Sequence, residues 1–371
     1  AAQGVRFAAS GLERPWQDGS ASLLDFAEAC GLRPSYIARL ASNENPEGCS
    51  PRALEALHGA ALEPWRYADP ACQTLREALA TGLAVEAERI VIGNGSEELI
   101  AAIARASLQP GRSALTVVPS FGLHEIEPLA CGALVTKIAM TADLGFDLSA
   151  LEQALAAQPA LCFLSTPWNP VGPALDRNQL QRLIAAVPRG TLLVIDEAYF
   201  EYADDNVPNG LELLCGSGLA YVLLRTFSKA YGLAGLRVGY AVCSHAEIAR
   251  AVASAKTPFN VNAAAQAAAL AAWGDQTWMR TSVQRLRAER ERVRAALQAQ
   301  GWRVATSQTN FLFIDSGRDS VAVADTLLRE HGILVKAWRE SGYHQFLRAT
   351  IGTRAENERL LAALATMAPA T

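Results

Sequence analysis

A lysine stands a few residues after an apolar segment in the second half of the chain. The stretch RTFSKAYGLAGLRVGY covers residues 225–240, and Ser228 and Lys229 follow the apolar run LAYVLL. A lysine that loses its hydration at the end of a buried strand has a lowered pKa and can act as a nucleophilic amine. The alternative is an ordinary charge in a solvated loop. Arg237 lies eight residues further on, before the apolar run VGYAV, where it would pair with an anion.

Two other apolar runs end in polar side chains that could share a site with this lysine. Asp196 ends the apolar part of LLVIDEAYFEY, and Tyr199 follows three residues later. Asn169 lies between two prolines in LSTPWNPVG, which restrict the backbone around it. Ligands of parallel sheets bind outside the carboxyl ends of the strands, so these side chains are candidates for one site. The alternatives are a helix-capping aspartate and a rigid turn.

A third signal is the segment IVIGNGSEELI, residues 90–100. A predicted strand ends at Gly93-Asn94-Gly95, and Ser96 and Glu97 open a predicted helix. Backbone N–H groups at such a helix start bind anions. The segment lacks the third glycine of a dinucleotide-binding motif and the lysine of a P-loop, so a plain turn with Ser96 as helix cap is the alternative.

Taken together, these strand ends offer an anion site, an amide, a carboxylate, a lysine and an arginine. That combination matches pyridoxal phosphate, in which a lysine forms a Schiff base with the aldehyde and a carboxylate pairs with the ring nitrogen. The nucleophile motif GxSxG and the zinc motif HExxH are both absent from the sequence. The histidines have no metal-ligand spacing, so we predict no metal site and ordinary surface or core roles for His58, His124, His245, His331 and His344.

The elements that must position these groups alternate along the chain. Short apolar runs separated by helix-like stretches predict an α/β domain with a mostly parallel sheet over residues 46–260. Residues 261–371 predict a smaller α+β domain, and residues 1–45 an irregular arm with a helical patch at 23–32. The arginines of the helix predicted at 282–300 are read as a solvated face, opposite an apolar side. The predicted strands are ERIVIG, SALTVV, ALCFLST, TLLVID, AYVLLRT and RVGYAV in the large domain, and WRVATSQTNFLFI, GILVKAW and FLRATIG in the small one.

Composition narrows the class of protein. The chain has 371 residues and a net charge of −4, from 33 basic and 37 acidic residues, which favours neither nucleic acid nor an anionic membrane. Its seven cysteines are scattered without a CxxC pair, which is typical of reduced thiols. No apolar run approaches the length of a membrane span, and the first residues do not resemble a signal peptide. These features predict a cytoplasmic protein.

The order of the motifs resembles the fold-type I pyridoxal-phosphate-dependent aminotransferases of classes I and II. The resemblance runs from about Leu40 to Thr353 through NENP, GNGSEE, PSFG, TPWNPVG, IDEAYFEY, the lysine stretch and LRATIGT. Within that class the chain is most similar to the histidinol-phosphate aminotransferases. This implies transamination between L-histidinol phosphate and 2-oxoglutarate, giving imidazole acetol phosphate and L-glutamate in histidine biosynthesis. An aromatic amino-acid aminotransferase and a threonine-phosphate decarboxylase are alternatives, and a non-enzymatic binding protein on the same scaffold is a remote one.

The resemblance also implies roles for individual residues around the cofactor. Lys229 would form a Schiff base with the cofactor and move a proton between the substrate Cα and the C4′ atom of the cofactor. Asp196 would keep the ring nitrogen protonated. The ring oxygen would be bonded by Asn169 and Tyr199, and Phe121 would stack on the ring. The cofactor phosphate would be held by Gly95, Ser96, Glu97 (through its N–H), Ser228 and Arg237.

Substrate and subunit contacts are implied in the same way. Arg348 matches an arginine that binds the substrate carboxylate, and Lys336 stands where many relatives have a phosphate-binding arginine, with Arg339 nearby. Asn43 lies in an N-terminal segment that closes over the substrate. Tyr67 matches a tyrosine that reaches the cofactor of the neighbouring subunit, which predicts a homodimer with shared active sites whose N-terminal arm packs on the small domain and on the partner.

Overall fold

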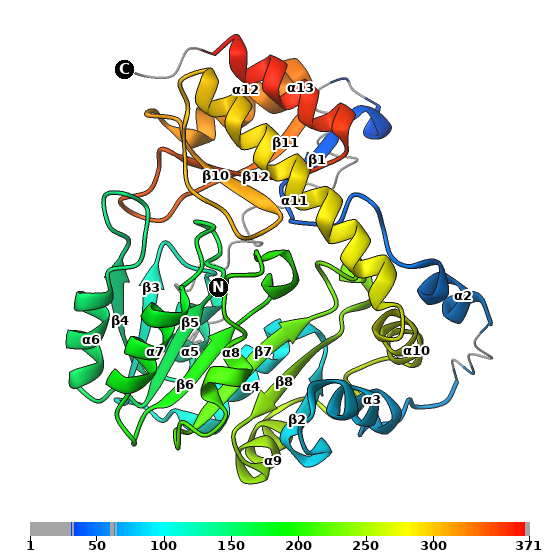
Figure 1. Ribbon diagram of the computed structural model, residues 1–371, viewed down its shortest axis with the longest axis vertical. Helices are drawn as coiled ribbons and strands as arrows, with labels where there is room; N and C mark the ends of the chain where they lie inside the picture. Colours follow the sequence, from blue (N-terminus) through cyan, green and yellow to red (C-terminus); the bar gives the residue numbers. More distant parts are fainter. Residues whose placement is uncertain (1–30, 32, 60–62, 64, 368–371) are drawn as a thin grey trace, which may run out of the picture.

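The computed structural model describes residues 31, 33–59, 63 and 65–367. Within these residues the chain forms a large seven-stranded sheet, a smaller five-stranded sheet and a long helix, α11, that runs beside both (Figure 1). The predicted helical patch at 23–32 lies outside the described residues, apart from Gly31. In the described part of the chain, none of the helices combines the length and apolar character of a membrane span.

The large sheet has the strand order β2-β8-β7-β6-β5-β3-β4. Strands β3 to β7 pair in parallel, and only the pairs β2–β8 and β7–β8 are antiparallel. The predicted mostly parallel α/β fold is therefore confirmed. The strands are β2 (Ile90–Gly93), β3 (Ser113–Val118), β4 (Leu134–Ala139), β5 (Leu161–Ser165), β6 (Leu192–Asp196), β7 (Tyr221–Thr226) and β8 (Gly239–Cys243).

Both faces of this sheet are buried, which explains why the sequences of its inner strands are continuous apolar runs. Phe163, Val194 and Val222 pack into a core on one face, while Leu193 and Leu223 belong to the core on the other face. Edge strand β4 was not predicted, because its sequence LVTKIA is largely exposed and lacks an apolar run.

Helices cover the two faces of the large sheet. Helix α4 contacts α5, α9 and strand β8. Helix α10 packs against α2 and α3. The helices of this part of the chain are α2 (Pro51–Gly59), α3 (Gln73–Leu83), α4 (Gly95–Ser107), α5 (Leu123–Ala130), α6 (Leu148–Ala156), α7 (Arg177–Ala186), α8 (Gly210–Leu214), α9 (Ala246–Ala255) and α10 (Ala263–Trp273), with short 3₁₀ turns at Ala87–Arg89, Phe200–Tyr202 and Ala234–Leu236.

The smaller sheet brings together two distant parts of the chain. Strand β1 comes from the N-terminal region and pairs in parallel with β11, while the other pairs are antiparallel. The strand order is β1-β11-β12-β10-β9. The elements are β1 (Ala38–Leu40), β9 (Arg303–Val304), β10 (Phe311–Asp315), β11 (Ile333–Ala337), β12 (Phe346–Thr350), α11 (Gln276–Ala299), α12 (Ser320–His331) and α13 (Arg354–Ala365), with a 3₁₀ turn at Pro34–Tyr36.

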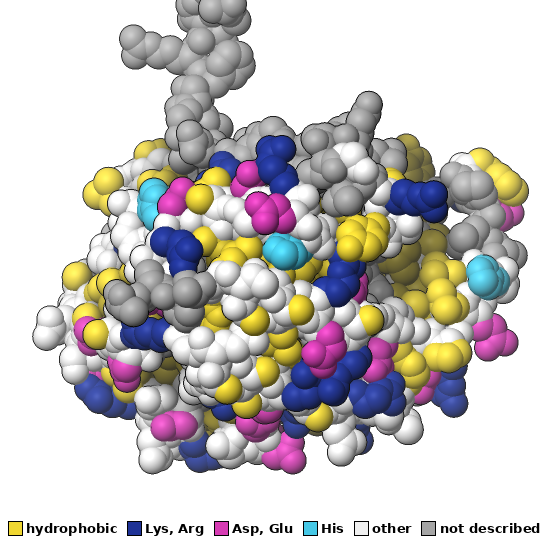
Figure 2. All heavy atoms as spheres, turned by 90° about the horizontal axis from the view of Figure 1, so that it is seen from above, with side chains coloured by type: hydrophobic (Ala, Val, Ile, Leu, Met, Phe, Trp, Pro, Cys, Tyr) yellow, Lys and Arg dark blue, Asp and Glu magenta, His cyan; other side chains and the backbone are white. Residues whose placement is uncertain are grey.

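The surface above the smaller sheet carries charges of both signs. Figure 2 shows basic and acidic side chains interspersed with hydrophobic ones on this face. The interspersed pattern agrees with the small net charge of −4.

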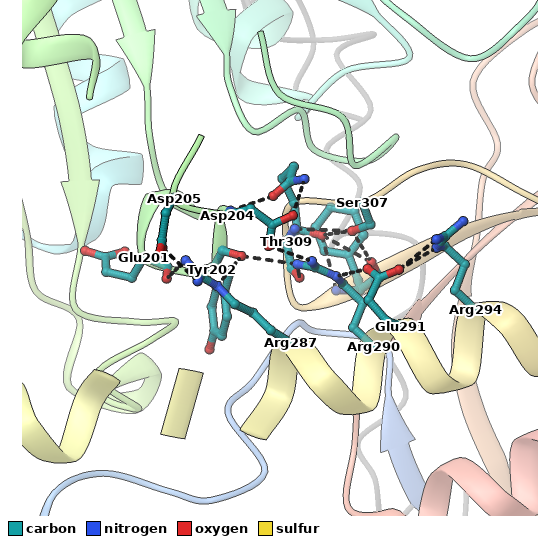
Figure 3. A network of polar contacts seen from close by, with 12 residues as sticks. Glu201, Tyr202, Asp204, Asp205, Arg287, Arg290, Glu291, Arg294, Ser307 and Thr309 are labelled. Atoms are coloured by element: carbon teal, nitrogen blue, oxygen red, sulfur yellow. Dashed lines mark hydrogen bonds and ion pairs between the residues drawn. The ribbon is translucent and has the colours of Figure 1, made fainter. Parts of the chain in front are cut away.

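Helix α11 corrects one prediction. Its apolar side is buried as expected, but Arg290 is only 1% exposed and does not belong to a solvated face. Its Nη1 donates to the carbonyl oxygens of Tyr202 (3.2 Å) and Thr309 (3.0 Å), and its Nε donates to Glu291 (2.9 Å), as Figure 3 shows. The buried guanidinium thus joins the loop after β6 to the segment before β10. The sequence held a signal for this, because position 290 falls on the same helical stripe as the apolar residues 286, 293 and 297.

Candidate functional site

A cavity of about 1030 Å³ lies between the carboxyl ends of the large-sheet strands and the smaller sheet. Residues from both sheets line it. The predicted site residues that line this cavity are Asn43, Ser96, Glu97, Phe121, Asn169, Asp196, Tyr199, Ser228, Lys229, Arg237, Lys336, Arg339 and Arg348. The fold therefore brings together side chains that are up to 305 positions apart in the sequence, from 43 to 348.

Lys229 lies in the turn that follows β7 and lines the cavity. Its side chain is half-buried, and Nζ donates to the carbonyl oxygen of Ser42 (3.0 Å). Burial, reinforced by the positive charges of Arg348 and Arg237, lowers the pKa of Lys229 from its ordinary value of 10.5 to about 8. With this pKa about a tenth of the amine is unprotonated at pH 7, and this neutral form can act as a nucleophile.

Asp196 ends β6 and is held by a histidine that was predicted to have an ordinary role. His124, which is 1% exposed, places Nε2 3.0 Å from Asp196 Oδ2, and its ring stacks on Phe163 at a centroid distance of 5.0 Å. A carboxylate oxygen only accepts, so Nε2 carries the proton of this hydrogen bond. The other oxygen, Oδ1, accepts from the N–H of Ala198 (3.1 Å). His124 is thus a core histidine, which is one of its predicted roles, but its hydrogen bond to Asp196 was not predicted, because no sequence spacing links the two residues.

Asn169 and Arg348 meet across the cavity. Arg348 Nη1 donates to Asn169 Oδ1 (2.7 Å), and Nη2 donates to the carbonyl oxygen of Ala41 (2.8 Å). The third nitrogen, Nε, is buried and has no hydrogen-bond partner. Burial lowers the pKa of Arg348, although a guanidinium stays charged at neutral pH. A buried cation with an unpaired donor at a cavity wall is suited to an anionic ligand.

Tyr199 is bonded by the N-terminal segment. Asn43 Nδ2 donates to the Tyr199 hydroxyl (2.8 Å), and Asn43 is itself held by Thr350 of β12, whose Oγ1 accepts from its N–H (2.9 Å) and donates to its Oδ1 (3.1 Å). Burial raises the pKa of Tyr199 to about 12, so the phenol stays protonated and can donate.

The predicted anion turn lies at the start of α4, beside Arg237. Gly95 has φ +75°, and a Cβ there would lie 2.6 Å from Arg237 Nη2, so glycine is required for the guanidinium to approach. A Cβ on Gly239 would lie 2.6 Å from the N–H nitrogen of Ser96. Glu97 holds the guanidinium through an ion pair, Nη2 to Oε2, of 2.9 Å. The small residues thus keep backbone N–H groups and a cation accessible in one corner of the cavity.

Neither Tyr67 nor Gly95 is among the residues that line this cavity. Tyr67 is 83% exposed and stacks on Phe259 with a ring-centroid distance of 4.5 Å. Trp65 beside it is 75% exposed. Tyr67 and Phe259 form an exposed aromatic pair, which we call the Tyr67 patch.

The chain matches the family model for aminotransferase class I and II over residues 36–364. Because the match covers most of the chain, the protein belongs to the class I and II aminotransferases. It has the fold type I architecture of this class, with a large mostly parallel sheet and an additional smaller sheet.

Individual relatives narrow the comparison. The chain is 43% identical over 330 residues to histidinol-phosphate aminotransferase 3 of Rhizobium meliloti (strain 1021), covering 88% of this chain and 89% of that protein. It is 37% identical to histidinol-phosphate aminotransferase of Shouchella clausii, covering 88% of each. Its structure is similar to the crystal structure of histidinol-phosphate aminotransferase from Sinorhizobium meliloti in complex with pyridoxal-5'-phosphate, with a TM-score of 0.89 and 29% identity over 99% of this chain and 98% of that one.

Proposed function

We propose that this protein is a pyridoxal-phosphate-dependent aminotransferase that converts L-histidinol phosphate and 2-oxoglutarate to imidazole acetol phosphate and L-glutamate. The observation that carries the chemistry is Lys229, whose amine has a pKa lowered to about 8 and lies in the same cavity as Asp196. The substrate is supported by the identity of 37–43% to several histidinol-phosphate aminotransferases.

The donor set of the cavity fits pyridoxal phosphate at both of its ends. A buried carboxylate suits the protonated ring nitrogen, and the start of α4 with Arg237 suits the phosphate. When bound, this cofactor supplies an electron sink that stabilises negative charge at the substrate Cα. The protein's contribution is to hold, orient and protonate the groups around it.

Each of the central residues has a defined task in this proposal. Lys229 accepts a proton from the substrate Cα, which its low pKa permits near neutral pH. Asp196, oriented by His124, keeps a proton on the ring nitrogen. Asn169 and the protonated hydroxyl of Tyr199 would hold the ring oxygen.

The cations of the smaller sheet would receive the substrate. Arg348 lines the cavity and would bind an anionic group of the substrate through its guanidinium. Lys336 and Arg339 line the same cavity and would bind the substrate phosphate. These three cations would suit an amino donor that carries both a carboxylate or hydroxyl end and a phosphate.

We also propose a homodimer in which Tyr67 of each subunit reaches the cofactor site of the other. The Tyr67 patch supports this, because exposed aromatic side chains are enriched at subunit interfaces. Mixing a Tyr67→Phe variant with a Lys229→Ala variant should restore part of the activity in hybrid dimers. Hybrids with no more activity than the parent variants would contradict shared sites.

Three further predictions remain proposals. They are the division into an arm (1–45), a large domain (46–260) and a small domain (261–371), a cytoplasmic location, and the packing of the arm on the small domain and on the partner. The pairing of β1 with β11 supports the last of these for residues 38–40.

A panel of amino donors tests the substrate. Cofactor-loaded enzyme is assayed in single turnover with histidinol phosphate, phenylalanine and threonine phosphate, and the loss of the cofactor's visible absorbance is followed. We expect the fastest conversion with histidinol phosphate. Strong turnover of phenylalanine with none of histidinol phosphate would refute the proposed substrate while leaving the aminotransferase class intact.

A further inference from the structure

The loop between β11 and β12 contacts the segment that follows β3. Glu340 Oε2, in this loop, accepts a hydrogen bond from the N–H of Ser120 (3.1 Å) and another from Nε1 of Trp338 (3.1 Å). The Tyr343 hydroxyl, three residues further on, donates to the carbonyl oxygen of Val118 (3.1 Å). Two hydrogen bonds thus connect the smaller sheet to the end of a large-sheet strand, and Ser120, Trp338 and Glu340 all line the cavity.

On the large-sheet side, the contacted segment leads directly to the predicted ring-stacking residue. Phe121 follows Ser120, and its ring packs edge-on against His124 at a centroid distance of 5.7 Å. His124 in turn bonds Asp196. The N–H that Glu340 bonds therefore belongs to the residue directly before Phe121, whose ring would face the cofactor.

On the smaller-sheet side, Trp338 packs against a substrate-binding candidate. The guanidinium carbon of Arg348 lies 5.9 Å from the centroid of the Trp338 ring, within the range of a cation–π contact. Glu340 fixes the indole through its N–H, so the same carboxylate oxygen restrains the walls on both sides of the cavity.

The two oxygens of Glu340 differ in their surroundings. Oε2 accepts both hydrogen bonds, whereas Oε1 is buried without a partner. Burial raises the pKa of Glu340, and the negative charge of Glu125 adds to this, while the Trp338 and Ser120 hydrogen bonds and Lys137 oppose it. The geometry needs only one accepting oxygen, so an amide at this position would preserve both contacts.

We propose that Glu340 is a positioning residue for the amino donor, which holds Trp338 and the Ser120–Phe121 backbone at a fixed separation across the cavity. The proposal rests on the proposed function only for the choice of amino donor. Walls that contact the substrate equally in its ground state and transition state contribute to KM more than to kcat.

Three variants separate this role from a general structural one. Glu340→Ala removes both hydrogen bonds, Glu340→Gln keeps an accepting oxygen, and Ser341→Ala changes an exposed residue of the same loop. For Glu340→Ala we expect KM for the amino donor to rise about tenfold, the size expected when hydrogen bonds to a carboxylate are lost, with kcat within about threefold of the wild type. Glu340→Gln should stay within about threefold of the wild type in both constants, and Ser341→Ala should match it.

Hydrogen exchange provides a readout that requires no substrate. In cofactor-loaded enzyme, peptides containing the amides of residues 120–122 should exchange faster in Glu340→Ala and remain protected in Glu340→Gln. If Glu340→Ala does not fold, Tyr343→Phe removes the neighbouring bond to Val118 and should raise KM in the same direction. Unchanged KM and exchange in Glu340→Ala, or equal impairment of the Gln and Ala variants, would overturn the proposal. Kinetics are measured with whichever donor the wild type converts fastest, so failure of the substrate assignment would not be mistaken for failure of this role.

Discussion

Lys229 should lower the stability of the cofactor-free enzyme, because the fold holds its amine where the charged form is disfavoured. Its pKa falls from 10.5 to about 8 in the folded state. Below pH 8 both the folded and the unfolded chain carry the proton, and the folded state bears the full cost of the buried charge. The cost declines as pH rises from 8 to 10.5 and vanishes above 10.5, where both states are neutral.

The magnitude follows from the two pKa values. At about 1.4 kcal/mol for each pKa unit, the cost at pH 7 is at most about 3 kcal/mol, and at pH 9.5 it is about 1 kcal/mol. Lys229 is half-buried and lines a cavity, so water screens part of this cost. We therefore expect Lys229→Met to raise the free energy of unfolding of the cofactor-free enzyme by about 1–3 kcal/mol at pH 7, and by less than half of that at pH 9.5.

Urea unfolding of cofactor-free wild-type and variant enzyme at both pH values measures this difference. Lys137→Met is the matched control, because its ion pair with Glu125 (2.9 Å) raises the pKa of Lys137, so its loss should leave stability unchanged or slightly lower. A Lys229→Met variant that is less stable than the wild type, or a stability gain that does not depend on pH, would refute the reasoning.

Three other substitutions have expected outcomes. Asp196→Asn should lower turnover by at least about a hundredfold with cofactor still bound, because an amide cannot hold the ring-nitrogen proton comparably; absorbance and steady-state rates measure both. Glu197→Ala should cost about 3–5 kcal/mol of unfolding free energy, since it leaves the buried Arg225 (2.8 Å away) unpaired, and adding Arg225→Met should recover part of that loss in urea unfolding. Arg290→Met should cost about 2–4 kcal/mol, because two carbonyl oxygens lose a buried donor, and an unchanged urea midpoint would contradict the importance of this junction.

The cofactor side of the site was predictable because its residues stand at the ends of strongly apolar strands. In a parallel sheet those ends meet at one edge, so Asp196 and Lys229 had to be neighbours once β6 and β7 were recognised. The nearby Asn169 follows β5 in the same way. Local sequence was therefore sufficient for this part of the site.

Other parts depend on contacts between segments that are distant in sequence. His124 lies 72 residues before Asp196 and has no spacing that marks it as its partner. Glu340 reaches Ser120 across 220 residues, through a loop with no recognisable pattern. Edge strand β4 escaped recognition because one exposed strand need not be apolar.

The sequence by itself determined the α/β class and the positions of the buried strands along the chain, and it singled out Lys229 as the candidate reactive lysine, because burial on both sheet faces and short glycine-containing turns leave local patterns. Only the tertiary structure decided that His124 orients Asp196, that Arg290 is buried at a junction and that Glu340 connects the two sheets. Each of these contacts joins a polar side chain to a partner on another element, and such contacts leave no periodic pattern in the amino-acid sequence.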